Sequence, residues 1–281
     1  MTISAGTAWA IDRVVTTDDG ARLAVTVTTP GRTTEPTVVL AHGWGAGRAV
    51  WRGVTDRLVA AGHAVVAYDQ RGHGDSTAGT GPVSISRLGD DLDAVLAAVD
   101  ARGAILAGHS GGGFAALAYA TGHPMGATIR LRGLVLLATA AHDQDTPAGE
   151  VRMMGNPVFS WALRRPALGR RMLRQTLGEN PSAAVQELNR ELFAATPGAV
   201  RAACFACSRG MDLRPQLAQV HVPAVVLAGA RDTVVAPRLG EAVAAALPAA
   251  RYELLPGAGH MLPLEAPAAV AAAVRDLSTA G

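Results

Sequence analysis

Residues 104–112 read Ala-Ile-Leu-Ala-Gly-His-Ser-Gly-Gly, and residues 114–119 continue as Phe-Ala-Ala-Leu-Ala-Tyr. The first four residues predict a buried strand, and the second run predicts a helix. Between them, Gly108 and Gly112 flank Ser110 in a G-x-S-x-G pattern. At a strand–turn–helix junction this pattern strains the central residue and exposes its hydroxyl, while the helix N-terminus offers N–H groups to a negative oxygen. Because the chain has 32 glycines, the short pattern needs support from the rest of the sequence.

Short apolar runs recur along the chain and predict a sheet. Some have apolar residues at consecutive positions: Thr37–Ala41, Ala64–Tyr68, Ala104–Ala107, Gly133–Ala138 and Ala224–Ala228. Such runs are typical of strands buried on both faces of a parallel sheet. The runs Arg22–Thr28 and Arg251–Leu255 are further predicted strands.

Segments with helical periodicity separate most of these runs. They are Trp51–Ala61, Leu88–Ala101, Phe114–Tyr119, Leu239–Leu247 and Ala268–Leu277. In Leu88–Ala101 the apolar residues form one stripe, and we expect Asp90, Asp91 and Asp93 to face away from it. Alternating strands and helices predict an α/β fold with a mainly parallel sheet.

The alternation stops between residues 142 and 215. This stretch has no convincing strand pattern and contains helix-like segments at Ala183–Phe193 and Ala199–Arg209. A helical insertion between two parallel strands is expected to cover the carboxyl edge of the sheet, where ligands bind. We therefore predict a core made of residues 1–141 and 216–281 and a helical cap, or lid, made of residues 142–215.

Apolar side chains from this cap and from the loop after the first buried run are candidates for lining a substrate pocket. They are Trp44, Met153, Met154, Phe159 and Trp161. For each cap residue, the alternative is ordinary packing inside the cap. An exposed apolar cap face would serve a homodimer as well as a lipid-like substrate, so the oligomeric state stays open.

A second loop is expected to complete the site around Ser110. The run Thr37–Ala41 ends in His42-Gly43-Trp44-Gly45, where a glycine-rich backbone can direct an N–H group toward the same point. We therefore expect the backbone N–H groups of Trp44 and Gly111 to form an oxyanion hole.

An acid and a base also follow predicted strands. Asp232 and His260 each lie just past a predicted strand end, and they follow Ser110 in the chain order Ser, Asp, His. This order is typical of triads on this type of α/β architecture. Asp143 and Asp145 follow another predicted strand and are alternatives for the acid.

The chain resembles members of the α/β-hydrolase superfamily, of the microbial kind that includes serine esterases, lipases and cofactor-free haloperoxidases. The resemblance covers about residues 14–277 and includes Tyr68-Asp69-Gln70-Arg71-Gly72-His73-Gly74-Asp75-Ser76, a segment that is mainly structural in this family. It implies an eight-stranded, mainly parallel sheet flanked by helices, with the cap after strand 6. It also implies that His260 accepts the proton of Ser110 while Asp232 orients the imidazole.

Several residues narrow the activity that the resemblance implies. A serine at position 110 argues against haloalkane dehalogenases and epoxide hydrolases, which need a carboxylate nucleophile. The loop His42–Gly45 differs from the His-Gly-Gly-Pro-Gly loop of proline iminopeptidases, which weakens a peptidase assignment. Gly45 and Gly111 replace the proline and the bulky residue that are usual in haloperoxidases, so we expect Gly111 to leave room beside the nucleophile. We predict hydrolysis of a carboxylic ester or thioester with a hydrophobic moiety, through an acyl-enzyme.

Other functions remain open on the same scaffold. One is a specialised thioesterase, acyltransferase or cyclase of a biosynthetic pathway, and others are a cofactor-free perhydrolase or haloperoxidase and a non-catalytic binding protein. An intact triad pattern argues against the binding protein. The arginines between Arg164 and Arg174 suit an acidic partner such as a carrier protein, although a solvated helix is the simpler interpretation.

The composition excludes several classes. All 25 basic residues are arginine, so P-loop, Schiff-base and Ser-x-x-Lys chemistry cannot be built. A net charge of +2 with scattered arginines disfavours nucleic-acid binding. The longest apolar runs are far shorter than the ~20 residues of a membrane span, and the first residues do not resemble a signal peptide. We therefore expect a cytoplasmic protein.

Neither a metal nor a cofactor is expected. Cys204 and Cys207 form a Cys-x-x-Cys pattern inside a helix-like stretch, and no second pair completes a zinc site, so we interpret them as buried thiols. The glycine-rich segment Gly43–Arg48 has arginine where a dinucleotide fingerprint needs its third glycine. The histidines show no metal-ligand spacing.

Overall fold

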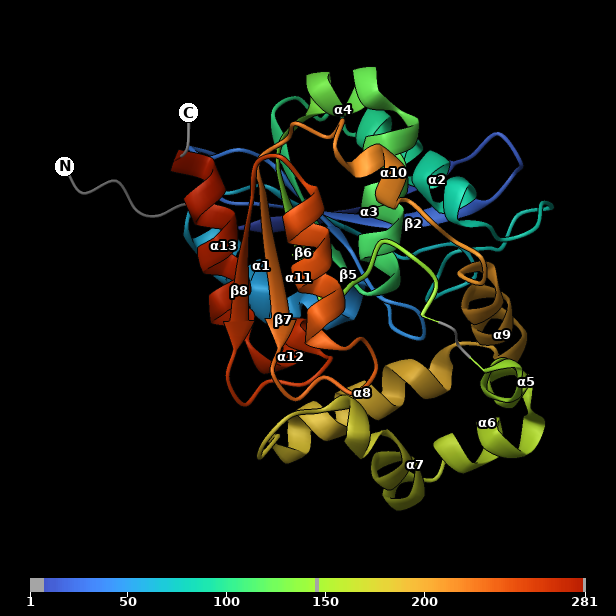
Figure 1. Ribbon diagram of the computed structural model, residues 1–281. Coiled ribbons are helices and arrows are strands. Elements are labelled where there is room, and N and C mark those ends of the chain that lie inside the picture. Colours follow the sequence, from blue (N-terminus) through green and yellow to red (C-terminus); the bar gives the residue numbers. More distant parts are fainter. Residues whose placement is uncertain (1–7, 145–146, 280–281) are drawn as a thin grey trace.

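The computed structural model describes residues 8–144 and 147–279. Within them, a single sheet has eight strands in the order β1-β2-β4-β3-β5-β6-β7-β8 (Figure 1). The strands are β1 Trp9–Thr16, β2 Arg22–Thr29, β3 Val38–Ala41, β4 Val65–Tyr68, β5 Ala104–His109, β6 Leu131–Leu137, β7 Ala224–Gly229 and β8 Ala250–Leu255. Strand β2 pairs antiparallel with β1 and β4, and all the other pairs are parallel. The mainly parallel, eight-stranded sheet predicted from the sequence is confirmed.

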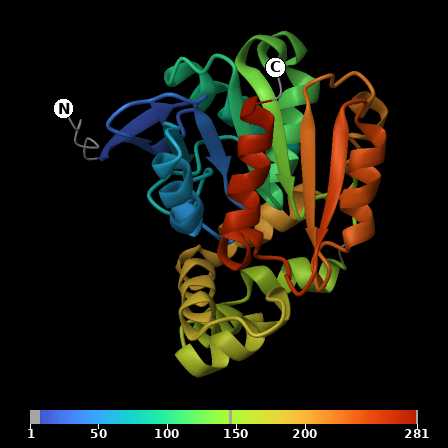
Figure 2. The same ribbon diagram turned by 90° about the vertical axis from the view of Figure 1, so that its left-hand side faces the viewer.

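Helices cover both faces of this sheet. They are α1 Arg52–Ala60, α2 Ile85–Ala98, α3 Gly111–Gly122, α4 Pro124–Arg130, α10 Arg214–Leu217, α11 Pro237–Ala246, α12 Leu262–Glu265 and α13 Pro267–Thr279. Helix α13 crosses one face of the sheet (Figure 2). Because both faces are covered, the central strands are apolar at consecutive positions rather than at alternate ones.

Strand β3 shows how the core divides into two layers. Val38 and Leu40 are buried with side chains of α1 and α13, whereas Val39 and Ala41 are buried with side chains of α2 and α3. This alternation follows from the two-residue period of a strand. The carboxyl end of β3 is thereby held at the centre of the sheet, next to β5.

Strand β1 is one element that the apolar pattern does not predict. It lies at the edge of the sheet and pairs only with β2, and Val15 is the one buried residue in it. Its remaining side chains are exposed, including those of Trp9, Ile11 and Val14. An edge strand with so little burial leaves no apolar run in the sequence.

Asp91 corrects the prediction for α2. Asp90 and Asp93 are partly exposed, but Asp91 is buried and accepts two hydrogen bonds of 2.6 Å from the guanidinium of Arg71. Arg71 also donates to Asp19 at 2.8 Å. The segment after β4 is therefore anchored to α2 and to the turn before β2, in line with the structural role that the resemblance implies.

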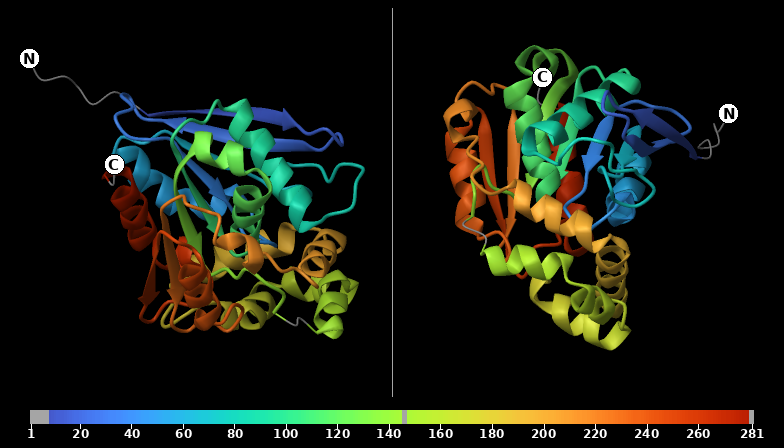
Figure 3. Two further views of the ribbon diagram at one scale, coloured as in Figure 1. Left: turned by 45° about the horizontal axis from the view of Figure 1, so that its top comes forward. Right: turned by 90° about the vertical axis from the view of Figure 1, so that its right-hand side faces the viewer.

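Between β6 and β7 the chain forms a layer of helices, here called the insert helices. They are α5 Ala148–Gly155, α6 Pro157–Leu163, α7 Pro166–Leu173, α8 Ala183–Ala195 and α9 Gly198–Cys207. They lie below the carboxyl ends of the parallel strands (Figures 1 and 3). The segment leaves and rejoins the core at one place, because His142 forms a β-bridge with Asp212 and the Leu213 N–H donates to the Ala141 carbonyl at 2.8 Å.

The residue Arg201 of α9 joins the insert helices to one another. Its side chain is fully buried, donates to the carbonyls of Met154, Phe193 and Thr196, and bonds Ser160 Oγ at 2.6 Å. No helix in the described ranges is long and apolar enough to cross a membrane.

Candidate active site

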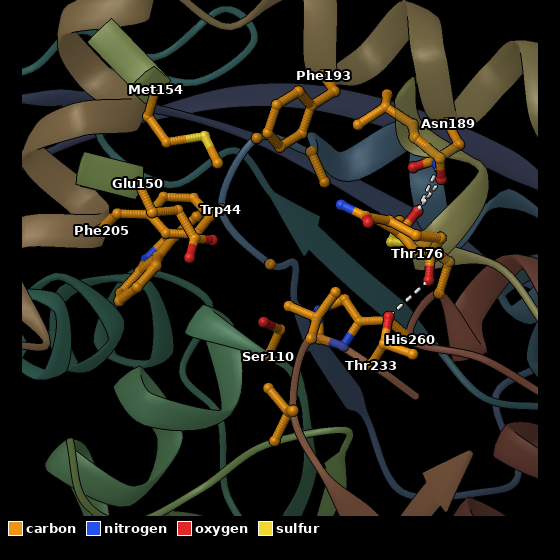
Figure 4. A pocket seen from close by; sticks show the side chains of 18 of the residues that line it. Trp44, Ser110, Glu150, Met154, Thr176, Asn189, Phe193, Phe205, Thr233 and His260 are labelled. Carbon is orange, nitrogen blue, oxygen red and sulfur yellow. Dashed lines mark hydrogen bonds between the residues drawn. The ribbon is translucent and has the colours of Figure 1, made fainter. Parts of the chain in front are cut away.

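Ser110 occupies the sharp turn between β5 and α3. Its backbone has φ 49° and ψ −117°, in a region that side chains with a Cβ rarely adopt. A Cβ on Gly108 would lie 2.5 Å from the Gly112 carbonyl oxygen, and one on Gly112 would overlap the Ala41 carbonyl. Both glycines are therefore required, as the sequence pattern predicts. The turn directs the Ser110 hydroxyl into a cavity, between Trp44 and His260 (Figure 4).

His260 and Asp232 meet beside this turn. His260 Nδ1 lies 2.9 Å from Asp232 Oδ2, and the Asp232 side chain is completely buried. The other carboxylate oxygen of Asp232 accepts the N–H groups of Val234 and Val235 at 2.8 and 2.9 Å. Because these contacts fix the carboxylate, Nδ1 keeps its proton and Nε2 remains as the acceptor. The described residues show no hydrogen bond between Ser110 Oγ and His260, although both line the same cavity.

The loop that carries His260 is held by residues that the sequence analysis does not identify. The carboxylate of Glu265, in α12, accepts the N–H groups of Gly259 and Met261 at 3.2 and 3.0 Å and that of Gly178 at 2.5 Å. His109 Nε2 lies 2.8 Å from the carbonyl oxygen of His260 and donates to it. The only available signal for Glu265 is its position five residues after His260, which is too weak to distinguish it from a surface carboxylate.

Two buried histidines hold the loop after β3. The Gly45 N–H donates to His73 Nε2 at 3.0 Å, and the Gln70 N–H donates to His42 Nε2 at 2.9 Å. Burial lowers the pKa of His42 to about 4 and that of His73 to about 3, so both rings are neutral acceptors near pH 7. Both rings therefore hold the loop through hydrogen bonds from backbone N–H groups.

The loop and the turn present two unused donors. Within the described residues, neither the Trp44 N–H nor the Gly111 N–H donates to another backbone carbonyl. These are the amides that the sequence analysis assigns to the oxyanion hole, and both residues adjoin the Ser110 turn. A negative oxygen at that point is the ligand that such N–H groups suit best.

Gly111 does not leave the open space expected from its missing side chain. A Cβ there would lie 2.5 Å from Trp44 Nε1, because the Trp44 indole already fills the region. The indole packs edge-on against Phe114 and at a tilt against Phe205, with ring centroids 5.3 and 5.6 Å away, respectively. Gly111 is therefore small because it accommodates Trp44, and the expectation of additional room is wrong.

The cavity lies between the sheet edge and the insert helices and has a volume of about 680 Å³. Met153, Met154 and Phe159 line it together with Trp44, as expected. Trp161 does not: it is 53% exposed, and the Arg165 guanidinium lies 4.8 Å from its ring centroid. Helix α6 turns Phe159 inward, and Trp161, two residues later, consequently points outward.

Other residues that line the cavity are not among the pocket candidates predicted from the sequence, and most of them are polar. They include Glu150, Thr176, Asn189, Phe205 and Thr233 (Figure 4), and also Ser208. Asn189 donates to Thr176 Oγ1 at 2.9 Å, and the Thr176 carbonyl accepts the His260 N–H at 2.9 Å. One wall of the cavity is therefore polar and directly connected to the His260 loop.

The remaining candidates lie elsewhere. Asp143 accepts the Gly210 N–H at 2.7 Å instead of approaching His260, and Asp145 lies outside the described residues. Cys204 and Cys207 lie within α9, and burial raises the pKa of both thiols, that of Cys207 to about 12. Among the described side chains, no group of three or more His, Cys, Asp or Glu is arranged to hold a metal ion.

Comparisons with known proteins agree with this fold. The sequence matches the family described as serine aminopeptidase, S33, over residues 32–267. It is 32% identical over 249 residues to the pimeloyl-[acyl-carrier protein] methyl ester esterase of Neisseria meningitidis serogroup A, covering 85% of this chain and 75% of that relative. A solved hydrolase structure from Pseudomonas aeruginosa is 30% identical in sequence and has a TM-score of 0.78. The match covers 96% of this chain and 98% of that chain. An esterase structure from Rhodococcus sp. is 25% identical, with a TM-score of 0.82 and coverage of 96% and 99%. The chain therefore belongs to the serine aminopeptidase (S33) family of the α/β-hydrolase superfamily and is a hydrolase.

Proposed function

We propose that the protein is a serine hydrolase that cleaves a carboxylic ester or thioester with a hydrophobic moiety. The observation that carries this proposal is the Asp232–His260 hydrogen bond beside Ser110, in a cavity with apolar walls. The esterase relatives support ester hydrolysis as the reaction. Residues 142–215 act as the cap that closes the cavity over the substrate.

The positions of these groups support the following reaction. Ser110 Oγ attacks the carbonyl carbon as His260 Nε2 takes its proton, and Asp232 stabilises the imidazolium that forms. The N–H groups of Trp44 and Gly111 donate to the tetrahedral oxyanion, and each such donor contributes about 2.7–4 kcal/mol in comparable sites. His260 then returns the proton to the leaving group. Water, activated by the same imidazole, releases the acid from the acyl-enzyme.

Ser110→Ala tests this mechanism against a matched serine. With p-nitrophenyl butyrate, we expect Ser110→Ala to lower kcat/KM by at least about 10³-fold, because the nucleophile is lost while the fold stays intact. Ser208 lines the same cavity and donates to the Phe205 carbonyl at 3.1 Å, so Ser208→Ala is the control and should retain most activity. Circular dichroism would verify the fold. Full activity in Ser110→Ala would disprove the proposed nucleophile.

A second candidate is release or transfer of an acyl chain attached to a carrier protein. Arg164, Arg165 and Arg171 are exposed around α7, and a Neisseria relative is named for an acyl-carrier-protein ester. An acidic carrier would be attracted to such a surface. A panel of p-nitrophenyl esters, with mass spectrometry of the intact protein, separates the two: steady turnover supports the esterase, and a stable acyl-enzyme supports the specialised enzyme.

A further inference from the structure

One carboxylate enters the cavity from the insert helices. Glu150 lies in the first turn of α5, lines the cavity, and points toward Trp44 (Figure 4). Among the described lining residues it is the only acidic side chain, and no arginine is among them. The cavity therefore presents one negative charge within otherwise neutral walls.

No described residue forms a hydrogen bond or ion pair with the Glu150 carboxylate, although its side chain is half-buried. Elsewhere in the insert helices, Glu187 is paired with Arg170 and Arg190 at 2.6 Å. The positive end of α5 favours a negative group in its first turn, but this does not require the side chain to point inward. A partly desolvated carboxylate without a partner is expected to attract a cation.

The nearby buried cation cannot fill this role. The Arg201 guanidinium lies behind the rings of Phe159 and Phe193, at 5.7 and 5.3 Å from their centroids. Its N–H groups already bond backbone carbonyls and Ser160. A molecule in the cavity would therefore meet the aromatic rings and not the guanidinium.

Aromatic rings line the same cavity as the carboxylate and suit the same kind of ligand. The Trp44 indole is fixed by Phe114, Phe205 and the close approach to Gly111. Trp44 and Phe205 both line the cavity. Aromatic faces attract ammonium groups, tryptophan most strongly, and the attraction grows when the ammonium is desolvated.

We propose that Glu150, Trp44 and Phe205 form a subsite for a positively charged ammonium group on the ester substrate. This inference rests on the proposed ester hydrolysis and adds the charge of the substrate to it. The carboxylate supplies the opposite charge, and the rings shield the alkyl substituents of the ammonium from water.

Matched ester pairs that differ only in charge test the subsite. One pair is acetylthiocholine and S-(3,3-dimethylbutyl) thioacetate, which places the charge on the leaving group. The other is the p-nitrophenyl esters of 6-aminohexanoate and heptanoate, which places it on the acyl chain. In at least one pair we expect kcat/KM to favour the cationic ester by about tenfold.

Glu150→Gln should remove this preference. We expect kcat/KM for the preferred cation to fall about tenfold and that for its neutral isostere to change by less than about twofold. Glu191→Gln is the control, because Glu191 belongs to an insert helix, has a 58% exposed side chain and does not line the cavity. Equal losses for both esters of a pair, or no preference in the unaltered protein, would overturn the inference.

Ligand binding tests the subsite separately from catalysis. Tetramethylammonium should change tryptophan fluorescence in the unaltered protein and in Ser110→Ala, but not in Glu150→Gln. Ser110-dependent turnover without charge discrimination would refute the subsite alone. Absence of Ser110-dependent turnover with every ester would refute the proposed function, whereas the fluorescence result would still decide on the subsite.

Discussion

Arg71 in the sheet core and Arg201 in the insert helices are both almost completely buried, and the two regions stabilise them differently. In the core, Arg71 meets two carboxylates, with Asp91 at 2.6 Å and Asp19 at 2.8 Å. In the insert helices, Arg201 has no carboxylate partner among the described residues and bonds only carbonyls and Ser160. Burial opposes the charge of both, but the carboxylates raise the pKa of Arg71, whereas burial lowers the pKa of Arg201.

The different partners of the two arginines match the structural roles of the two regions. The Arg71 ion pairs join three distant chain segments whose relative positions set the loops around Ser110. Arg201 joins the ends of insert helices, and the rings beside it, Phe159 and Phe193, also form a cavity wall. Core stability should therefore depend on paired charges, whereas the packing of the insert helices should affect the cavity more than the global free energy of unfolding.

Arg71→Met should have the largest effect on stability. Methionine has a similar length but leaves the buried Asp91 carboxylate without its partner, so we expect the free energy of unfolding to fall by about 3–5 kcal/mol. Urea denaturation measures this change. Arg87→Met is the control, because Arg87 pairs with an Asp18 that is 76% exposed and should cost about 1 kcal/mol or less. Similar losses in the two variants would contradict the importance of buried charge pairing.

Lowering the pH should have the second largest effect on the stability of the core. The folded-state pKa values of His42 and His73, about 4 and about 3, lie below the 6.5 of the unfolded chain. Between these values the unfolded chain binds protons that the folded protein does not, so stability is lost as the pH falls. Each histidine should cost about 2 kcal/mol between pH 7 and pH 5.

Urea denaturation at several pH values measures the slope of the free energy of unfolding against pH. Burial also lowers the pKa of His109, so three histidines contribute, and His73→Gln should reduce the slope by roughly a third, whatever its effect on the absolute stability. The carboxylate of Asp19, whose pKa Arg71 lowers, titrates below this range and does not contribute. An unchanged slope in His73→Gln would show that acid acts through other groups. Residues 142–215 contain one histidine, His142, so the slope reports mainly on the core.

Much of the fold and of the candidate site can be predicted from the sequence, because the sequence patterns that indicate them are local. Consecutive apolar residues mark the doubly covered strands, and Gly108, Ser110 and Gly112 mark a turn that tolerates few other residues. Asp232 and His260 follow strand ends, and parallel strands bring those ends to one edge of the sheet.

The errors concern contacts between distant segments. Periodicity predicts an exposed Asp91, but the approach of Arg71 from the segment after β4 makes its burial favourable. A missing side chain at Gly111 suggests open space, but Trp44 from another loop fills it. The inward direction of Glu150 and the outward direction of Trp161 depend on how short helices pack, which the sequence pattern of a single helix does not determine.

Arg201→Met should have the smallest effect on global stability and so provides the sharpest contrast with Arg71→Met. The substitution removes hydrogen bonds to carbonyls but also removes a buried charge that has no carboxylate partner, and these effects partly cancel. We expect a loss of about 1 kcal/mol in urea denaturation. Because Phe159 and Phe193 lose the guanidinium that they pack against, KM for p-nitrophenyl butyrate should rise more than kcat falls.

Arg201→Lys keeps the charge without the fork of donors, so it should destabilise the protein more than methionine does. A lysine variant more stable than the methionine variant would mean that the charge of Arg201, and not its geometry, holds the insert helices together.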